Sequence, residues 1–144
     1  MDSDFYTMKG YQLNEVADIT SAMEDYLEMI CRMARSRDFI RISELAESLH
    51  VKPPSASKMT ANLKDAGFVE FEKYGYIKLT EKGLSAGGYL LYRHDVLNEF
   101  LCLVNGAENE TEQVEKIEHF LNRKTVDNIN KINELIKKYR NVIL

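Results

Sequence analysis

Long apolar segments are absent from this 144-residue sequence. No run approaches the roughly 18 to 20 apolar residues that cross a bilayer. The N-terminal stretch "MDSDFYTMKGYQLNE" has no basic region followed by an apolar core, so we do not expect it to be a secretory signal. Hydrophobic residues make up 44% and charged residues 29% of the chain, as in ordinary globular proteins. We therefore expect a cytoplasmic protein that does not bind membranes.

Cysteine is also scarce. Cys31 and Cys102 are the only two, and they are too far apart to form a CxxC motif. Isolated thiols in a chain without a signal are typical of buried small residues in a reducing compartment. We expect neither thiol to have a redox role.

Positive charge is in slight deficit, with a net charge of -4. This balance is against a general polyanion binder, but local charge decides contact with nucleic acid. Residues 48–64, "SLHVKPPSASKMTANLK", contain lysines and a histidine but no acid. We interpret this window as a candidate phosphate-facing surface.

The chain divides into an N-terminal arm over residues 1–20, a first domain over 21–80 and a second over 81–144. From Ser21, apolar residues recur at helical spacing, and Ser21 with Glu24 forms an S-x-x-E capping box. A short helix capped by Ser43 follows, and then a second that has Pro53 and Pro54 in its first turn and ends at Gly67.

Two short helices joined by a tight turn predict a helix-turn-helix. The next stretch, "FVEFEKYGYIKLT", alternates apolar and polar residues around Tyr74 and Gly75, which predicts a β-hairpin. Together these elements predict a mainly α protein with an N-terminal winged helix-turn-helix and a two-stranded wing.

The second domain is predicted to be helical. Thr80 caps a helix to about Leu103, residues 110–121 form another, and Thr125 caps a last helix to about Tyr139. Three glycines in the long helix suggest close packing against a neighbouring helix: Gly83, Gly87 and Gly88.

Carboxylates and histidines cluster in the pattern of a metal site. In "EKIEH", two glutamates and a histidine lie at i, i+3 and i+4, on one face of a helix. A second pair at i, i+3 lies on the first helix, and one more histidine lies on the long helix. The candidate ligands are Asp25, Glu28, His94, Glu115, Glu118 and His119.

The charges of this set favour two divalent cations, because its four carboxylates would otherwise repel one another. Oxygen and imidazole donors without thiolate suit Mn²⁺ or Fe²⁺ better than Zn²⁺ or Cu⁺. We interpret the third histidine, His50, as structural or close to DNA. A solvated acidic surface remains the alternative for each pair taken alone.

At these motifs the chain resembles the diphtheria-toxin-repressor (DtxR) family of metal-dependent repressors, and in particular its manganese-responsive MntR branch. The resemblance covers about residues 20–139 through "SAMEDYLEMI", "RISELAESLHVKPPSASKMTANLKDAGFV", "EKYGYIKLTEKG", "LLYRHDVLNEFL" and "VEKIEHFL". It places the family's paired metal site on the same six residues. Asp25 stands where iron-responsive members carry Met, and Glu118 where they carry Cys. Both differences favour Mn²⁺.

The resemblance implies a non-enzymatic transcriptional repressor that controls metal-ion homeostasis, with two Mn²⁺ per subunit and Fe²⁺ as a second possibility. It implies a homodimer, joined through the helices after residue 80, that binds a palindromic operator. The family's C-terminal SH3-like domain is not expected. Pro53-Pro54 departs from the commoner Pro-Ser pair of the family.

The resemblance also makes the second short helix, about residues 54–66, the recognition helix. Its polar face, with Thr60 at the edge, and the wing supply the expected DNA contacts: Ser55, Ser57, Lys58, Asn62, Lys64, Lys73 and Tyr74, with Lys78 beside them. Because few arginines are available to read guanine, we expect phosphate contacts and DNA shape to supply much of the affinity.

Two other classes of protein remain open. The first is a di-metal carboxylate oxidase on a helical bundle, which also uses Glu-x-x-His motifs. That class needs two such motifs and no winged helix. The second is a winged-helix regulator that does not sense metal, in which the acidic cluster is merely solvated.

Overall fold

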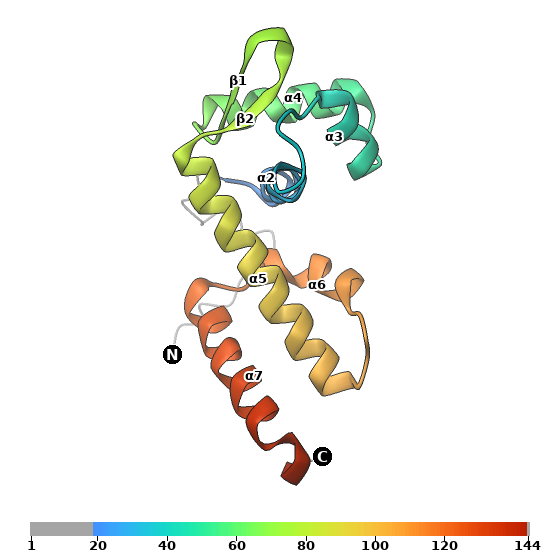
Figure 1. Ribbon diagram of the computed structural model, residues 1–144, viewed down its shortest axis with the longest axis vertical. Helices are drawn as coiled ribbons and strands as arrows, with labels where there is room; N and C mark the ends of the chain where they lie inside the picture. The colour runs from blue at the N-terminus through green and yellow to red at the C-terminus, as the bar shows by residue number, and fades with distance from the viewer. Residues whose placement is uncertain (1–18, 144) are drawn as a thin grey trace, which may run out of the picture.

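The computed structural model describes residues 19–143, with side chains to Arg140, so the predicted arm lies almost wholly outside it. A winged-helix head leads into a helical second half (Figure 1). Short 3₁₀ segments at Lys73–Gly75 and Glu118–Phe120 supplement the regular elements. These are α2 (Ser21–Ala34), α3 (Ile42–Leu49), α4 (Pro53–Asp65), β1 (Val69–Phe71), β2 (Ile77–Leu79), α5 (Glu81–Asn105), α6 (Thr111–Ile117) and α7 (Arg123–Ile143).

The helix-turn-helix is formed by α3 and α4, as predicted. His50 closes α3 in the left-handed region at φ 55°, and the Val51 amide donates to the carbonyl of Ala46 at 3.0 Å. The two prolines occupy the first turn of α4, where their missing amides cost nothing. The predicted cap at Ser43 is wrong, because α3 already begins at Ile42 and its N-cap is Arg41.

The wing is an antiparallel pair in which Val69 faces Leu79 and Phe71 faces Ile77. Its tip needs left-handed backbone at Tyr74 (φ 70°) and Gly75 (φ 77°). Glycine adopts this left-handed backbone conformation more easily than tyrosine does. The side chain of Tyr74 is nevertheless found there, exposed at the tip of the wing. The predicted hairpin is confirmed.

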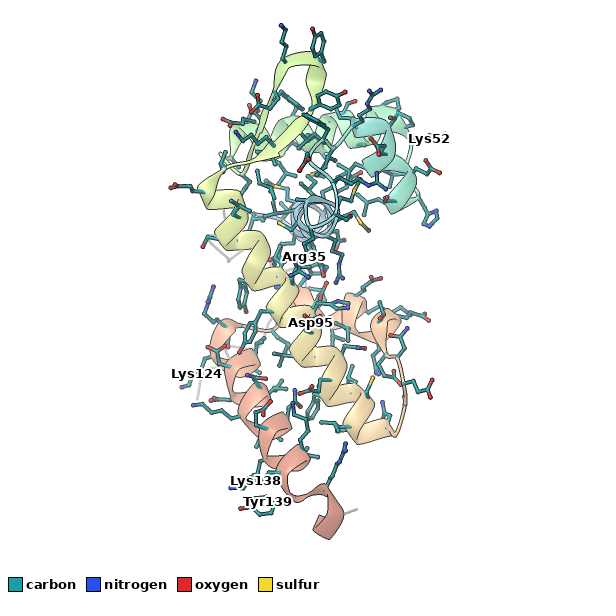
Figure 2. All side chains as sticks on the ribbon, viewed as in Figure 1. Arg35, Lys52, Asp95, Lys124, Lys138 and Tyr139 are labelled. Carbon is teal, nitrogen blue, oxygen red and sulfur yellow. The ribbon has the colours of Figure 1, made fainter. Side chains whose placement is uncertain are left out.

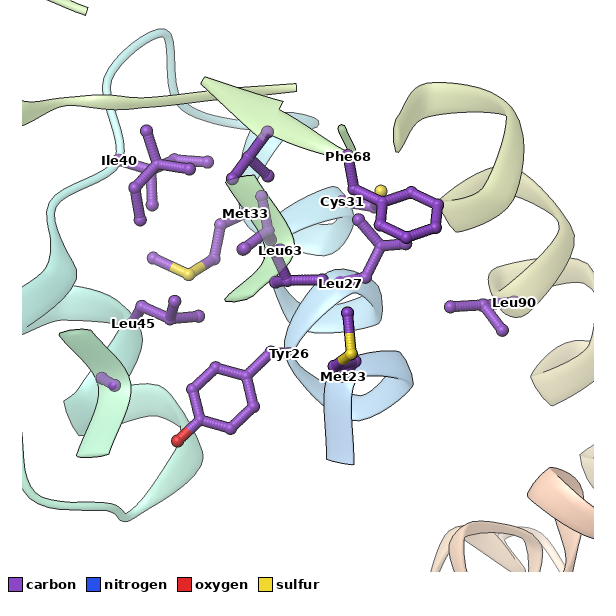
Figure 3. Close-up of a cluster of buried hydrophobic side chains, with 14 of the residues drawn as sticks. Met23, Tyr26, Leu27, Cys31, Met33, Ile40, Leu45, Leu63, Phe68 and Leu90 are labelled. Atoms are coloured by element: carbon purple, nitrogen blue, oxygen red, sulfur yellow. The ribbon is translucent and has the colours of Figure 1, made fainter. Parts of the chain in front are cut away.

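The core of the head surrounds α2, as Figure 3 shows. Leu27 and Ile30 are completely buried there, and Leu45 of α3 and Leu63 of α4 close over them. Leu90 of α5 joins the same cluster. The long helix therefore begins inside the core of the first domain, and the boundary predicted at residue 80 stays a prediction.

Close helix packing explains two of the three glycines in α5. A Cβ at Gly83 would lie 1.9 Å from the carbonyl oxygen of Phe68, and one at Gly87 would lie 1.9 Å from Sγ of Cys31. A Cβ at Gly88 would have nothing within 4 Å. The prediction of close packing therefore holds for the first two positions, where α5 meets the residue before β1 and meets α2, and fails for the third.

The second half is built by α7 along α5, with α6 on another side of α5 (Figure 1). The amide of Asn133, which is fully buried, donates to the carbonyl of Val96 at 3.0 Å. Among the described residues, no helix is long and apolar enough to cross a bilayer.

Three predicted caps have different outcomes. Thr80 caps α5 as predicted, because its hydroxyl accepts from the Gly83 amide at 3.0 Å. The prediction for Ser21 is wrong, since Thr20 caps α2 by accepting from the Met23 amide at 3.2 Å. At α7 the Asn122 side chain accepts from the amide of Thr125 at 2.8 Å, so Thr125 lies inside the helix. Hydroxyl and amide side chains compete for the same free amides at a helix start.

Candidate metal centre

The candidate ligands converge where the head joins the second half. Asp25 and Glu28 lie one turn apart on α2, His94 lies on the central part of α5, and Glu118 and His119 lie on the 3₁₀ turn after α6. Their side chains come within a few ångströms of one another between α2, α5 and the 3₁₀ turn. The cluster therefore joins segments that lie far apart in the sequence.

The inner part of the cluster consists of Glu28, His94 and Glu118, all of them buried. Nδ1 of His94 lies 3.5 Å from Oε1 of Glu28 and 3.4 Å from Oε2 of Glu118. These distances are too long for strong hydrogen bonds. One atom from each of the three residues lies within 4.8 Å of the others.

The outer part consists of Asp25, His119 and the same Glu118. Nε2 of His119 lies 2.9 Å from Oδ1 of Asp25, whose side chain is half exposed. Because Glu118 belongs to both groups, its carboxylate lies between an inner and an outer set of donor atoms. Glu118 is therefore the residue that the two groups have in common.

Burial and proximity shift the protonation of these groups. Burial, followed by the charge of Glu118, raises the pKa of Glu28 above its usual range. The carboxylate of Glu118, 3.4 Å from Nδ1, raises the pKa of His94, against the effect of burial. Hydrogen bonds with Asp25 and then Glu24 raise the pKa of His119 to about 9. Protons therefore offset part of the repulsion between the carboxylates.

The residues present fit a divalent cation. Among the described residues, both oxygens of Glu118 lack a hydrogen-bond partner although the side chain is 0% exposed. Such orphaned buried oxygens are costly and call for a partner. The donors are carboxylate and imidazole, which suit Mn²⁺ and Fe²⁺. Neither thiol joins the cluster, and burial raises the pKa of Cys31 to about 11.

The sixth predicted ligand, Glu115, lies exposed on α6 and outside both groups. The sequence predicted one continuous helix over residues 110–121, and this is wrong. The α-helix ends at Ile117 and a 3₁₀ turn follows from Glu118 to Phe120. A 3₁₀ turn has about 3.0 residues instead of 3.6, so the two segments no longer share one helical face. The role of Glu115 stays a prediction.

Sequence reasoning missed two residues beside the cluster. Glu24 on α2 accepts from Nδ1 of His119 at 2.9 Å, and the guanidinium of Arg93 on α5 lies 3.4 Å from both oxygens of Glu24. The available signal was adjacency, since Glu24 directly precedes Asp25 and Arg93 directly precedes His94. The sequence pattern places Glu24 only in a capping box.

The predicted DNA contacts lie on two surfaces of the head. All seven are exposed: Ser55, Ser57, Lys58, Asn62 and Lys64 on α4, and Lys73 and Tyr74 on the wing. Thr60, placed at the edge of this face, is instead fully buried, and its hydroxyl donates to the carbonyl of Ala56 at 2.7 Å. Lys78 pairs with Glu72 at 3.2 Å, so a phosphate would have to compete for it.

Comparisons with known proteins agree on one family. Residues 18–77 match the family model described as iron dependent repressor, N-terminal DNA binding domain. The HTH-type transcriptional regulator MntR of Oceanobacillus iheyensis is 40% identical over 111 residues, which are 76% of this chain and 76% of that protein. MntR of Bacillus subtilis strain 168 is 38% identical over 111 residues, covering 76% of this chain and 78% of that protein.

A solved structure, that of the manganese regulator SloR, matches with a TM-score of 0.70 and 26% identity. The match covers 79% of this chain and 54% of the SloR chain. The winged-helix head, the helical second half and the sequence similarity over three quarters of the chain all lead to the same assignment. The chain belongs to the iron-dependent repressor family of DNA-binding transcriptional regulators, the family of the diphtheria-toxin repressor.

Proposed function

We propose that this protein is a Mn²⁺-responsive transcriptional repressor of metal homeostasis, in which metal binding favours the DNA-binding arrangement of a homodimer. One observation carries the proposal: Glu118 is fully buried, its oxygens lack partners among the described residues, and it belongs to both ligand groups. Two cations that share this carboxylate would account for its burial. Fe²⁺ is the alternative metal, because the same donors suit it.

The donors link parts of the chain that have different tasks. Glu28 belongs to α2, which carries the core of the head, while His94 and Glu118 belong to the second half. When bound, the cations supply positive charge that draws these carboxylates and the imidazole together. The chain's own residues then hold α2 at one angle to α5 and α6. To raise operator affinity 100-fold, this coupling must be worth about 2.7 kcal/mol.

The head would bind DNA through α4 in the major groove, with the wing beside it. Lys58 and Lys64 would contact phosphates, and Ser55 and Ser57 would add contacts through their hydroxyl groups. The helix start itself offers no free amide for this, because Pro53 and Pro54 have no N–H and the Ser55 amide donates to the carbonyl of Lys52 at 3.0 Å. A homodimer would place two such heads on a palindromic operator. Exposed apolar side chains at three- and four-residue spacing on α7 support a protein contact there: Ile132, Leu135 and Tyr139.

A Mn²⁺ titration of operator binding tests the function. Operator duplexes are first selected from a random library with the Mn²⁺-loaded protein, and affinity is then measured at increasing Mn²⁺. We expect affinity to rise about 100-fold for the parent, and Asp25→Ala to abolish this rise while the variant still folds. Glu112→Ala, an exposed position on α6, serves as the control and should behave as the parent. Metal-dependent binding by Asp25→Ala at parental strength would contradict the proposal.

An O₂-consumption assay together with this titration separates the alternatives. A di-metal oxidase would consume O₂ when loaded with Fe²⁺, and a regulator that does not sense metal would bind DNA equally with and without Mn²⁺. Family membership is against catalysis, since the relatives are named as transcriptional regulators. The cytoplasmic location stays a prediction.

A further inference from the structure

Glu24 on α2 contacts the His119 ring. Its Oε1 lies 2.9 Å from Nδ1 of His119, and an ionised carboxylate can only accept a hydrogen bond. Nδ1 must therefore carry the hydrogen in this contact. A cation bound at Nε2 would take the place of the hydrogen on that nitrogen, while Nδ1 keeps its hydrogen toward Glu24.

Nε2 faces the candidate ligands. It lies 2.9 Å from Oδ1 of Asp25, and His119, Asp25 and Glu118 together form the outer donor group. Histidines that bind metals commonly donate their second ring N–H to a carboxylate, which fixes the ring and raises its basicity. Glu24 occupies the position of that carboxylate.

Arg93 holds Glu24 in turn. The side chain of Arg93 is 3% exposed, and its Nη1 and Nη2 each lie 3.4 Å from one oxygen of Glu24. Nη2 also lies 3.4 Å from Nδ1 of His119. Both of these nitrogens carry hydrogens here, so Glu24 is the acceptor that they share. The positive guanidinium offsets the negative charge of Glu24. Glu24 therefore adds less electrostatic repulsion to the neighbouring carboxylate of Asp25.

The positions of Glu24 and Asp25 on α2 are consistent with different roles, Glu24 as a partner of His119 and Asp25 as a candidate ligand. Successive helical residues point about 100° apart, so Glu24 and Asp25 can contact His119 from two sides. Glu24 is the more enclosed of the two, with its side chain 16% exposed against 50% for Asp25. An ion pair that only joined α2 to α5 would stabilise the fold without any contact to His119.

We propose that Glu24 and Arg93 form a positioning pair that holds His119 with Nδ1 toward Glu24 and Nε2 toward the metal. The inference rests on the proposed function, because it assumes that the cluster binds a cation. It adds two residues that touch no metal themselves and act through His119.

Mn²⁺ affinity of the full chain, measured by electron paramagnetic resonance of free Mn²⁺, provides the first test. Glu24→Ala should weaken Mn²⁺ binding about 10- to 100-fold. Glu24→Gln, whose amide oxygen can accept from the same N–H, should recover a large part of that loss. The control is Glu99→Ala on α5, which removes an ion pair with Lys137 of α7. Parental affinity in Glu24→Ala would overturn the positioning role, whereas absence of binding in the parent would overturn the proposed function.

A second measurement does not depend on any variant folding. With Zn²⁺ as a diamagnetic probe, two-bond ¹H–¹⁵N spectra report which nitrogen of His119 carries the proton. We expect a protonated Nδ1 and a metal-bound Nε2. A metal-bound Nδ1 would overturn the inference, because that atom would then have left Glu24.

Discussion

Oε2 of Glu118 lies 3.4 Å from Nδ1 of His94, and neither carboxylate oxygen of Glu118 has a hydrogen-bond partner among the described residues. A side chain that is 0% exposed and incompletely satisfied in this way is costly to the fold. The cost is understandable if the position is retained for a ligand. Glu118 is therefore the residue on which predictions about the metal centre depend most directly.

Removing the shared carboxylate should affect both proposed sites at once. We expect Glu118→Ala to lose tight binding of both cations, whereas Asp25→Ala should keep one tight site, because Asp25 belongs to the outer group alone. The number of Mn²⁺ ions retained per subunit after gel filtration checks this. Retention of both ions by Glu118→Ala would show that this carboxylate is not shared.

Stability of the metal-free protein should fall as pH rises from about 6.5 to about 9, because the pKa of His119 is raised to about 9 from an ordinary value of 6.5. The folded state favours protonated His119, so its contribution is complete below pH 6.5 and disappears as the pH passes 9. The difference is on the order of 3 kcal/mol at most. The raised pKa of Glu28 also makes stability fall with rising pH, beginning from its ordinary value of 4.5.

Urea denaturation at several pH values with a chelator present measures this effect. His119→Gln should flatten the dependence in this pH range. The control is His50→Asn at the exposed left-handed position after α3, which should leave the dependence intact. A metal-free parent of constant stability between pH 6.5 and 9 would contradict the prediction.

Two neighbouring glycines in α5 should respond in opposite ways to alanine. Gly87→Ala should destabilise the protein by about 1–3 kcal/mol, because its Cβ would lie 1.9 Å from Sγ of Cys31. Gly88→Ala should stabilise it by up to about 1 kcal/mol, since a Cβ there meets nothing within 4 Å. Urea denaturation of both variants checks the signs, and adding Cys31→Ala to Gly87→Ala should recover part of the loss.

Lys58 should contribute one phosphate contact. We expect Lys58→Ala to weaken operator binding and to lower the log–log salt slope by about one unit. Lys124, in the second half of the molecule away from the head (Figure 2), provides the control variant Lys124→Ala. The salt dependence of operator affinity at saturating Mn²⁺ is the measurement, and an unchanged slope in Lys58→Ala would remove Lys58 from the contacts.

Local patterns were sufficient for most of the head. The apolar spacing around Leu27 predicted α2, the prolines before Ser55 predicted the start of α4, and alternation around Tyr74 predicted the wing, all of which the structure confirms. Each of these signals depends only on residues that are close together in the sequence, so the sequence alone is enough to predict the element. The predicted sixth ligand shows the limit, because the switch to a 3₁₀ turn after Ile117 has no comparable local signal.

The sequence by itself determined the residue types of the metal centre, since carboxylate and imidazole donors at helical spacing are a chemical property of the chain. Only the tertiary structure decided how they meet: it made Glu118 common to two groups and brought Glu24 and Arg93 to His119. It also decided that Gly87 packs tightly against Cys31 whereas Gly88 has open space beside it. These outcomes depend on how α2, α5 and α6 pack, and packing joins side chains whose distance along the sequence carries no information about their distance in space.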